Sequence, residues 1–537
     1  MAITLRLVKG TQLTYAEADV NFQSLYYSSS QVGNSIVLYT TGSATQAATS
    51  ASYNIGLGNS VAATGLYSHA QGDSTKAGGI AAHAEGRYSS ASGDYSHAEG
   101  YNTTASFWGA HTEGVNTLAS NYYSHAEGNA TIASGQSAHA EGQATIASGQ
   151  AAHTEGANTI ASGIGSHAEG NNTTASGDYS HAEGKSNTAK GGNSHAEGFL
   201  TLASGSNSHA EGYQTIASAS YSHAEGYNTK AIGTISHTEG SSTVTYGNSA
   251  HAEGVSSIAR ADYSHAEGDT TQAVGTASHA EGANTLASGS SSHAEGTGTT
   301  ASGDYSHAEG EAALAQGYAS HAEGNTTTAS GSYSHAEGVS TITTGYGAHA
   351  EGNSTIAAAD YSHAEGNITT ASADYSHAEG SNTRATQLGA HAEGERTWAS
   401  NYYAHAEGYN TTGSGAYSHA EGYATLASGD YSHAEGNSTI AAGTYQSVHG
   451  QFNASSTGRS AFIVGNGLSN ASRSNLIFAS GSLVQITGSL LINDIAVLTP
   501  RTTTPTSPAN GTVIVSGSGA NQHLYCYLNS TWKQLDN

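Results

Sequence analysis

The sequence is poor in the residues from which globular cores and disulfide frameworks are usually built. Its 537 residues include only 6 Phe, 3 Pro, 1 Met and 1 Cys, and 10% are charged. The single cysteine, Cys526, excludes an intrachain disulfide framework and a cysteine-based metal cluster. Scarce proline and lysine beside 32 tyrosines are also unlike a disordered chain. The chain therefore needs a fold that is stable with small side chains.

Long apolar runs are missing as well. No stretch of 18 apolar residues could span a bilayer, and the first residues, MAITLRLVKG, do not form the apolar run of a secretory signal. We therefore expect neither membrane insertion nor ordinary secretion. The net charge of -27 without a basic patch argues against nucleic acid as a partner. No Gly-rich phosphate loop or nucleophile elbow occurs, so we expect no enzymatic activity.

The dominant feature of the sequence is a 14-residue repeat. A histidine stands at every fourteenth position from His69 to His433, which makes 27 units without an insertion or deletion. Strict spacing of this kind predicts stacked coils, each built from one repeat.

Within a unit, the histidine is followed by Ala or Thr, then Glu in all units but one, then Gly. Ser or Ala precedes the histidine. This alternation predicts a strand with Ser and Ala on one face and His and Glu on the other. A second short strand is predicted at the Thr-x-Ala that follows, as in 103–105, and glycines at the fourth and often the eleventh place are expected at corners.

The pattern Ser-His-Ala-Glu-Gly resembles the Ser-apolar-Ala-apolar-Gly repeat in the heads of trimeric autotransporter adhesins. The resemblance covers residues 51–450 and implies an all-β, homotrimeric, left-handed parallel β-roll with 14-residue coils. His and Glu stand where that family has apolar residues facing the partner chains. The apolar version survives at the ends of the repeat, in Ile55 and Leu57 and in Phe462 and Val464. A lumen of Ser and Ala buries little apolar area, so association between chains is expected to supply the rest.

The repeated pair accounts for nearly all of the net charge. Of 41 acidic residues, 26 are repeat glutamates, and the other 15 nearly balance 14 Lys and Arg. Because unpaired buried carboxylates are costly, we predict His–Glu hydrogen bonds between chains around a trimer axis, with raised histidine pKa values. Representative members of this predicted ladder are His83, Glu85, His97, Glu99, His181, Glu183, His307, Glu309, His433 and Glu435.

Two other interpretations of the pair remain open. Three imidazoles and three carboxylates around an axis would suit axial metal ions, although ions in every layer would lie too close together. Alternatively, both side chains are simply solvated on an outer face. No other cofactor is expected. Tyrosine two places before the histidine in 13 units forms a stripe that we expect to pack at a corner or between chains.

The flanking segments resemble parts of phage tail fibres. Residues 1–50 contain an alternating stretch, 3–8, and a capping box that opens a predicted short helix, 14–25, as in the attachment end of such fibres. Residues 451–499 resemble interwoven trimerisation strands, 500–508 a proline-rich linker, and 509–537 a small C-terminal β tip. Tyr525, Tyr527 and Trp532 are the candidate receptor-binding residues of that tip.

These features together predict a homotrimeric phage fibre located in the virion. Its N-terminus is expected to join a tail, baseplate or collar protein, and its tip to contact a glycan or protein of the host surface. The alternative is a fibrous adhesin on a bacterial cell surface.

Overall fold

The computed structural model describes residues 36–38, 54–491, 506, 508, 510–518 and 521–536. These residues form an all-β structure without a helix, and within them no helix is available that could cross a membrane. About 29 coils of a parallel β-solenoid with 14-residue repeats make up most of the structure, which confirms the predicted period. The predicted strand 3–8 and helix 14–25, and most of 500–508, lie outside the described residues.

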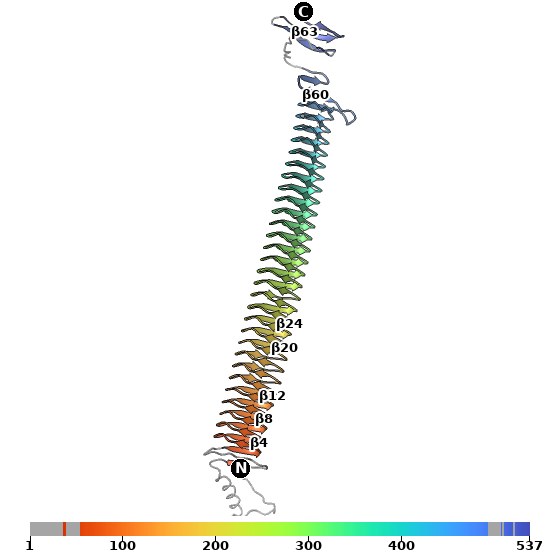
Figure 1. Ribbon diagram of the computed structural model, residues 1–537. Helices are drawn as coiled ribbons and strands as arrows, with labels where there is room; N and C mark the ends of the chain where they lie inside the picture. Colours follow the sequence, from red (N-terminus) through yellow and green to blue (C-terminus); the bar gives the residue numbers. More distant parts are fainter. Residues whose placement is uncertain are drawn as a thin grey trace, which may run out of the picture. The chain divides into compact units, whose positions relative to one another are not determined.

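The chain divides into two compact units, residues 1–399 and 400–537, and each unit is described by itself. In unit 1, every repeat contributes one longer and one shorter strand, as in β8 (His97–Tyr101) and β9 (Thr104–Ala105). The longer strands recur from β4 (His69–Asp73) to β50 (His391–Glu395), and the shorter from β3 (Ala62–Ala63) to β51 (Trp398–Ala399). Figure 1 shows these coils one above another between β4 and β24. In four coils the longer strand has two residues: β14 (His139–Ala140), β16 (His153–Thr154), β18 (His167–Ala168) and β28 (His237–Thr238).

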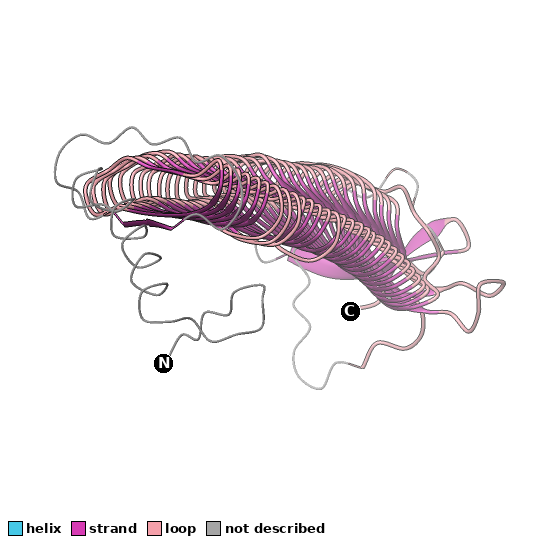
Figure 2. Ribbon diagram, turned by 90° about the horizontal axis from the view of Figure 1, so that it is seen from below, coloured by secondary structure: helices cyan, strands magenta, loops and turns pink. Residues whose placement is uncertain are grey.

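Within each unit, successive coils of the repeat pair in parallel and with identical register. Between β8 and β10 (His111–Val115), His97 lies opposite His111 and Glu99 opposite Glu113. The shorter strands do the same, so that Ala105 lies opposite Ala119. In Figure 2, which looks along the stack, strands of successive coils lie behind one another. A residue type repeated in the sequence therefore becomes a continuous column on the solenoid.

The lumen of each coil is filled by small side chains. Ser96 and Ala98 from the longer strand, and Thr103 and Ala105 from the shorter one, are buried. The Ser96 hydroxyl donates a hydrogen bond of 2.6 Å to the Gly93 carbonyl, which closes the turn that leads into the longer strand. The alternation predicted for the strands is thus confirmed, because successive side chains of a strand point to opposite faces.

The two glycine positions of a repeat serve different purposes. Gly100, at the fourth place, has φ +116, and a Cβ there would lie 2.0 Å from the Gly114 carbonyl oxygen. Gly93, at the eleventh place, has no positive φ, and a Cβ would lie 1.9 Å from the Phe107 oxygen. Glycine at the eleventh place therefore permits close approach of the coils, not a special backbone conformation. The left-handed turn residues stand instead at the sixth and thirteenth places, as in Asn102 (φ 56) and Tyr95 (φ 60).

Aspartates at the twelfth place join neighbouring coils. The Asp178 carboxylate accepts a hydrogen bond of 2.9 Å from the backbone N–H of Ile164, one coil earlier. The same bond recurs at Asp94, Asp262, Asp304, Asp360, Asp374 and Asp430. Each bond satisfies a turn N–H that the strand ladders do not reach.

Replacing Asp178 with alanine should therefore lower stability by about 1 kcal/mol, whereas Asp178→Asn should retain most of it, because the amide oxygen still accepts the bond. Hydrogen exchange at the Ile164 amide measures the effect, with about fivefold faster exchange expected in the alanine variant. Equal exchange in the two variants would contradict this role of the carboxylate.

The end of the repeat in unit 1 keeps the coil but changes its side chains. In β2 (Ile55–Asn59), Ile55 lies opposite His69 and Leu57 opposite Gln71, as the sequence pattern predicts. The short strand β1 (Ile36–Leu38) pairs in parallel with β2.

Unit 2 begins with coils of the same type and ends with antiparallel strands. Its longer strands are β52 (His405–Tyr409), β54 (His419–Tyr423), β56 (His433–Asn437), β58 (Ser447–Gln451) and β59 (Phe462–Asn466), and its shorter ones are β53 (Thr412–Gly413), β55 (Leu426–Ala427) and β57 (Ile440–Ala441). Val448 and Ile463 fill the lumen where earlier coils have alanine. β60 (Asn475–Ser480) then pairs antiparallel with β59, and β61 (Leu483–Ile486) with β60. Within one chain these strands form a hairpin, and interweaving with other chains stays a prediction.

The C-terminal residues form a three-stranded antiparallel sheet of β62 (Val513–Ser518), β63 (Asn521–Leu528) and β64 (Thr531–Gln534). Cys526 lies buried in β63, as a small apolar residue would.

Candidate functional site

The repeated histidines and glutamates form two parallel columns on the outer face of the longer strands. We call these columns the ladder: the histidines at 14-residue spacing from His69 to His433, with the glutamate two places after each, except that Gln71 follows His69. In unit 1 the ladder runs from His69 to His391, and in unit 2 it begins at His405. Identical register between coils brings these residues together.

The imidazole rings stack along the ladder. His209 and His223 have ring centroids 4.7 Å apart and planes inclined by 2°, and most neighbouring pairs are similar. The separation follows the strand spacing of about 4.8 Å. A few pairs are tilted, for example by 42° between His349 and His363, so the rings are able to leave the parallel arrangement.

Most ladder glutamates approach the histidine of their own coil. All five pairs singled out from the sequence are brought together, with Nε2–Oε2 distances from 3.4 to 3.9 Å: His83–Glu85, His97–Glu99, His181–Glu183, His307–Glu309 and His433–Glu435. Most of these distances exceed those of an N–H···O hydrogen bond. The Nε2 atoms of these five histidines are buried and make no hydrogen bond among the described residues.

Burial and stacking lower the histidine pKa values within the chain. The pKa of His265 is lowered to about 4, first by burial and then by the neighbouring His279 and His251, while Glu281 opposes the change. The pKa values of His307 and His433 are lowered for the same reasons. The raised pKa values predicted for an interface between chains are thus not a property of the single chain, where the direction is the opposite. At neutral pH such imidazoles are uncharged and leave the carboxylates unneutralised.

The carboxylates also affect one another. A hydrogen bond with Glu239, and after it burial, raise the pKa of Glu253. Glu239 and Glu253 belong to successive coils, so the charge column is self-repelling along its own length.

At the last coil of the ladder, the glutamate has a histidine as its neighbour on the next coil. Ser447 lies opposite His433, which places His449 beside Glu435 instead of another glutamate. His449 Nδ1 lies 2.9 Å from Glu435 Oε2, and its Nε2 lies 2.8 Å from the Ser447 hydroxyl. The final carboxylate is therefore bound by an imidazole of the next coil.

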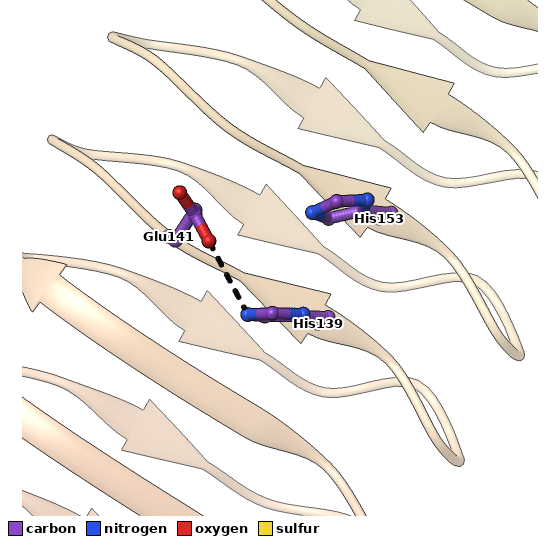
Figure 3. A group of neighbouring side chains, drawn as sticks. All are labelled: His139, Glu141 and His153. Carbon is purple, nitrogen blue, oxygen red and sulfur yellow. Dashed lines mark ion pairs between the residues drawn. The ribbon is translucent and has the colours of Figure 1, made fainter.

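Groups of two histidines and one glutamate could hold a metal ion. In the group His139, Glu141 and His153, one ligand atom of each residue lies within 4.8 Å of the others. Figure 3 shows the Glu141 carboxylate directed toward the His139 ring, with the His153 ring on the next coil. Comparable groups follow along the ladder.

Tyrosines line the corners of the solenoid and are exposed. Tyr263, two places before its histidine, is 67% exposed and occupies a turn with φ 60, so it does not pack into the corner of its own chain. Tyr361 and Tyr375 stack at 5.3 Å. A second aromatic column, at the fifth place of the repeat, was not predicted. It includes Tyr213 and Tyr227, with centroids 4.9 Å apart, and tyrosine four places after the histidine was the available signal.

The three candidate receptor-binding residues lie on one face of the C-terminal sheet. Tyr525 and Tyr527 are two residues apart on β63, and Trp532 of β64 lies directly opposite Tyr527. The rings of Tyr527 and Trp532 have centroids 5.1 Å apart. All three side chains are half-buried. The sheet thus presents a compact aromatic surface, whereas the ladder presents a long charged one.

Comparison of the chain with protein-family models and with curated proteins finds no match.

Proposed function

We propose that the protein is a homotrimeric fibre of a phage particle, in a tail, baseplate or collar, whose solenoid is a rigid shaft for attachment to a host cell. The observation that carries this proposal is the repetition itself. Coil after coil has the same register and a lumen closed by Ala and Ser, so the architecture supplies length and stiffness.

Two features of the single chain support the association of three chains: the small apolar area that it buries and the apolar residues that it leaves exposed. The lumen buries mainly Ala, Ser and Thr, whose apolar area is small, so one coil stack gains little from the hydrophobic effect. Exposed apolar residues also occupy the histidine place in coils outside the ladder: Ile55 in unit 1 and Phe462 in unit 2. A trimer axis along the ladder would cover all of them, with the left-handed β-roll of the resembling adhesin heads as its expected geometry.

The ends of the chain have the remaining roles in this proposal. Residues 1–50 join the particle, and the aromatic surface of Tyr525, Tyr527 and Trp532 contacts a glycan or protein on the host. Aromatic rings that are half-buried on a sheet offer a rigid apolar platform for either kind of ligand.

Analytical ultracentrifugation of the full chain tests the trimer, with an expected mass three times the 54.1 kDa of one chain. Substituting Glu197, Glu211 and Glu225 with arginine should dissociate the trimer. The matched control places arginine at Ile216, Val244 and Ile258 in the shorter strands, where Lys230 already occupies the equivalent position. A mass of one chain for the wild type would contradict the trimer. Dissociation by the control substitutions alone would show that the chains associate through the face of the shorter strands.

Labelling of the C-terminus in electron micrographs of particles tests the location. We expect the label at the free end of a fibre on the virion. A label found only on bacterial envelopes would favour the cell-surface adhesin instead.

A further inference from the structure

The geometry points to a further site: we infer that the ladder binds divalent transition-metal ions of the zinc type, each held by two histidines of successive coils and the glutamate between them. His139, Glu141 and His153 form one such site. The inference stands on the geometry of a single chain and does not depend on the proposed function.

The distance between histidine and glutamate is the first support. His139 Nε2 and Glu141 Oε2 are 3.6 Å apart, too far for a strong hydrogen bond. Zinc binds imidazole nitrogen and carboxylate oxygen at about 2.0–2.2 Å in a tetrahedral arrangement, which places two ligand atoms about 3.4 Å apart. The pair is therefore spaced as two ligands of one ion.

The second support is that the histidine Nε2 atoms are buried without a hydrogen-bond partner. Nε2 of His139, His153 and His167 is buried and makes no hydrogen bond among the described residues. A buried polar atom without a partner is costly, and a metal ion that binds its lone pair removes that cost. Imidazole together with carboxylate favours zinc, nickel or copper over magnesium or calcium, which prefer oxygen alone.

Both histidine rings have to move to complete the site. The rings of His139 and His153 have centroids 4.8 Å apart and are inclined by 17°, so they must tilt toward each other by about 1 Å to share one ion. Tilts of 47° and 42° already occur, at His69–His83 and His349–His363. The His139 side chain is 39% exposed, which leaves room for that rotation.

Charge is the third support and also limits occupancy. The 26 ladder glutamates carry nearly all of the net charge of -27, and successive carboxylates follow the strand spacing of about 4.8 Å. Bound cations relieve that repulsion. However, His153 belongs both to the group with Glu141 and to the next one with Glu155, and its Nε2 can bind only one ion. We therefore expect at most one ion for every two coils, with ions about 9.6 Å apart.

Equilibrium dialysis of the EDTA-treated full chain against Zn²⁺ tests the inference. We expect saturable binding that approaches one Zn²⁺ for every two ladder coils, and X-ray absorption at the zinc edge should report two imidazoles per ion. Binding that does not saturate, or zinc bound without imidazole, would overturn it.

Two block variants test the ligands. The first replaces five histidines with glutamine, and we expect it to lose two or three ions per chain: His139, His153, His167, His181 and His195. The second replaces their five glutamates with glutamine and should weaken binding at those sites about tenfold, because each loses one of three protein ligands: Glu141, Glu155, Glu169, Glu183 and Glu197.

The matched control is Asp178, Asp262 and Asp304→Asn, which removes carboxylates outside the ladder and should leave the number of bound ions unchanged. Circular dichroism establishes that each variant is folded. Unchanged affinity in the glutamate block would show binding by imidazoles alone, and equal loss in the control would show unspecific attraction. Either result would overturn the three-ligand site.

Discussion

Replacing Gly296 with alanine is expected to destabilise its part of the solenoid by about 3–5 kcal/mol, one of the largest effects that a single methyl group can have. Gly296 has φ +102, where side chains are strained, and a Cβ would lie 2.1 Å from the carbonyl oxygen of Gly310 in the next coil. To relieve that contact the two coils must separate, which breaks the strand hydrogen bonds between β36 (His293–Thr297) and β38 (His307–Glu311).

The same coil contains the control for this prediction. Gly298 also has a positive φ, +66, but a Cβ there meets nothing within 4 Å. Other repeats hold Asn102 or Ala312 at this sixth place, so Gly298→Asn should change stability by less than about 0.5 kcal/mol. Hydrogen exchange of peptides spanning residues 282–324 measures both variants, because a solenoid can open locally. Equal exchange in the two variants would show that the approach of the coils at Gly296 does not limit stability.

Acid should destabilise the metal-free solenoid between about pH 6.5 and pH 4. The pKa of His265 is lowered to about 4 in the folded chain, so the unfolded chain binds more protons in this interval, and stability falls as the pH falls. His125 behaves likewise. Each pKa unit corresponds to about 1.4 kcal/mol, and partial exposure reduces this to on the order of 1 kcal/mol per histidine.

The groups around His265 determine this direction. It faces His251 and His279 on the adjacent coils, whose proton charges would repel its own, and the carboxylates of Glu267 and Glu281. The raised pKa of Glu253 works in the opposite sense, because its contribution is lost as the pH rises.

Thermal unfolding followed from pH 7.5 to pH 4 in the presence of EDTA measures the acid effect. Many coils share it, so we expect the melting temperature to fall by about 10 °C or more. In a variant with His251, His265 and His279 replaced by glutamine, hydrogen exchange of residues 251–285 should become less sensitive to acid. Loss of stability on raising the pH through 6.5 would contradict the prediction and would indicate that carboxylates of other chains charge the imidazoles.

Much of the fold was predictable because the repeat dictates it. The 14-residue period, the inward Ser96 and Ala98 and the corner at Gly100 all follow from alternation and from the conformations open to glycine. The reason for glycine at Gly93 could not be predicted in this way. The contact that requires it is with a residue 14 positions later in the chain, which the local sequence pattern does not reveal. The hydrogen bond from Asp178 to the previous coil was missed for the same reason.

The site was predicted in its residues but not in its electrostatics. The pattern placed His181 and Glu183 on one outer face, and the structure confirms their proximity. The sequence interpretation assumed that each imidazole would be charged by a carboxylate. Instead, the imidazoles stack on each other at strand spacing, and burial with mutual repulsion outweighs attraction to the more exposed carboxylates, as at His307. The strand spacing that creates the columns thus also favours the uncharged form of the imidazoles.

Identical register has a consequence for how the length of such a solenoid can change. Because equivalent positions of successive repeats lie opposite each other, as His209 lies opposite His223, removing or adding one whole repeat preserves the register of the remaining coils. A change in repeat number that keeps the 14-residue frame is therefore expected to preserve the coil. Each event lengthens or shortens the protein by one step of about 4.8 Å. The length of the solenoid is thus expected to change in whole coils, while the columns of histidine and glutamate are kept.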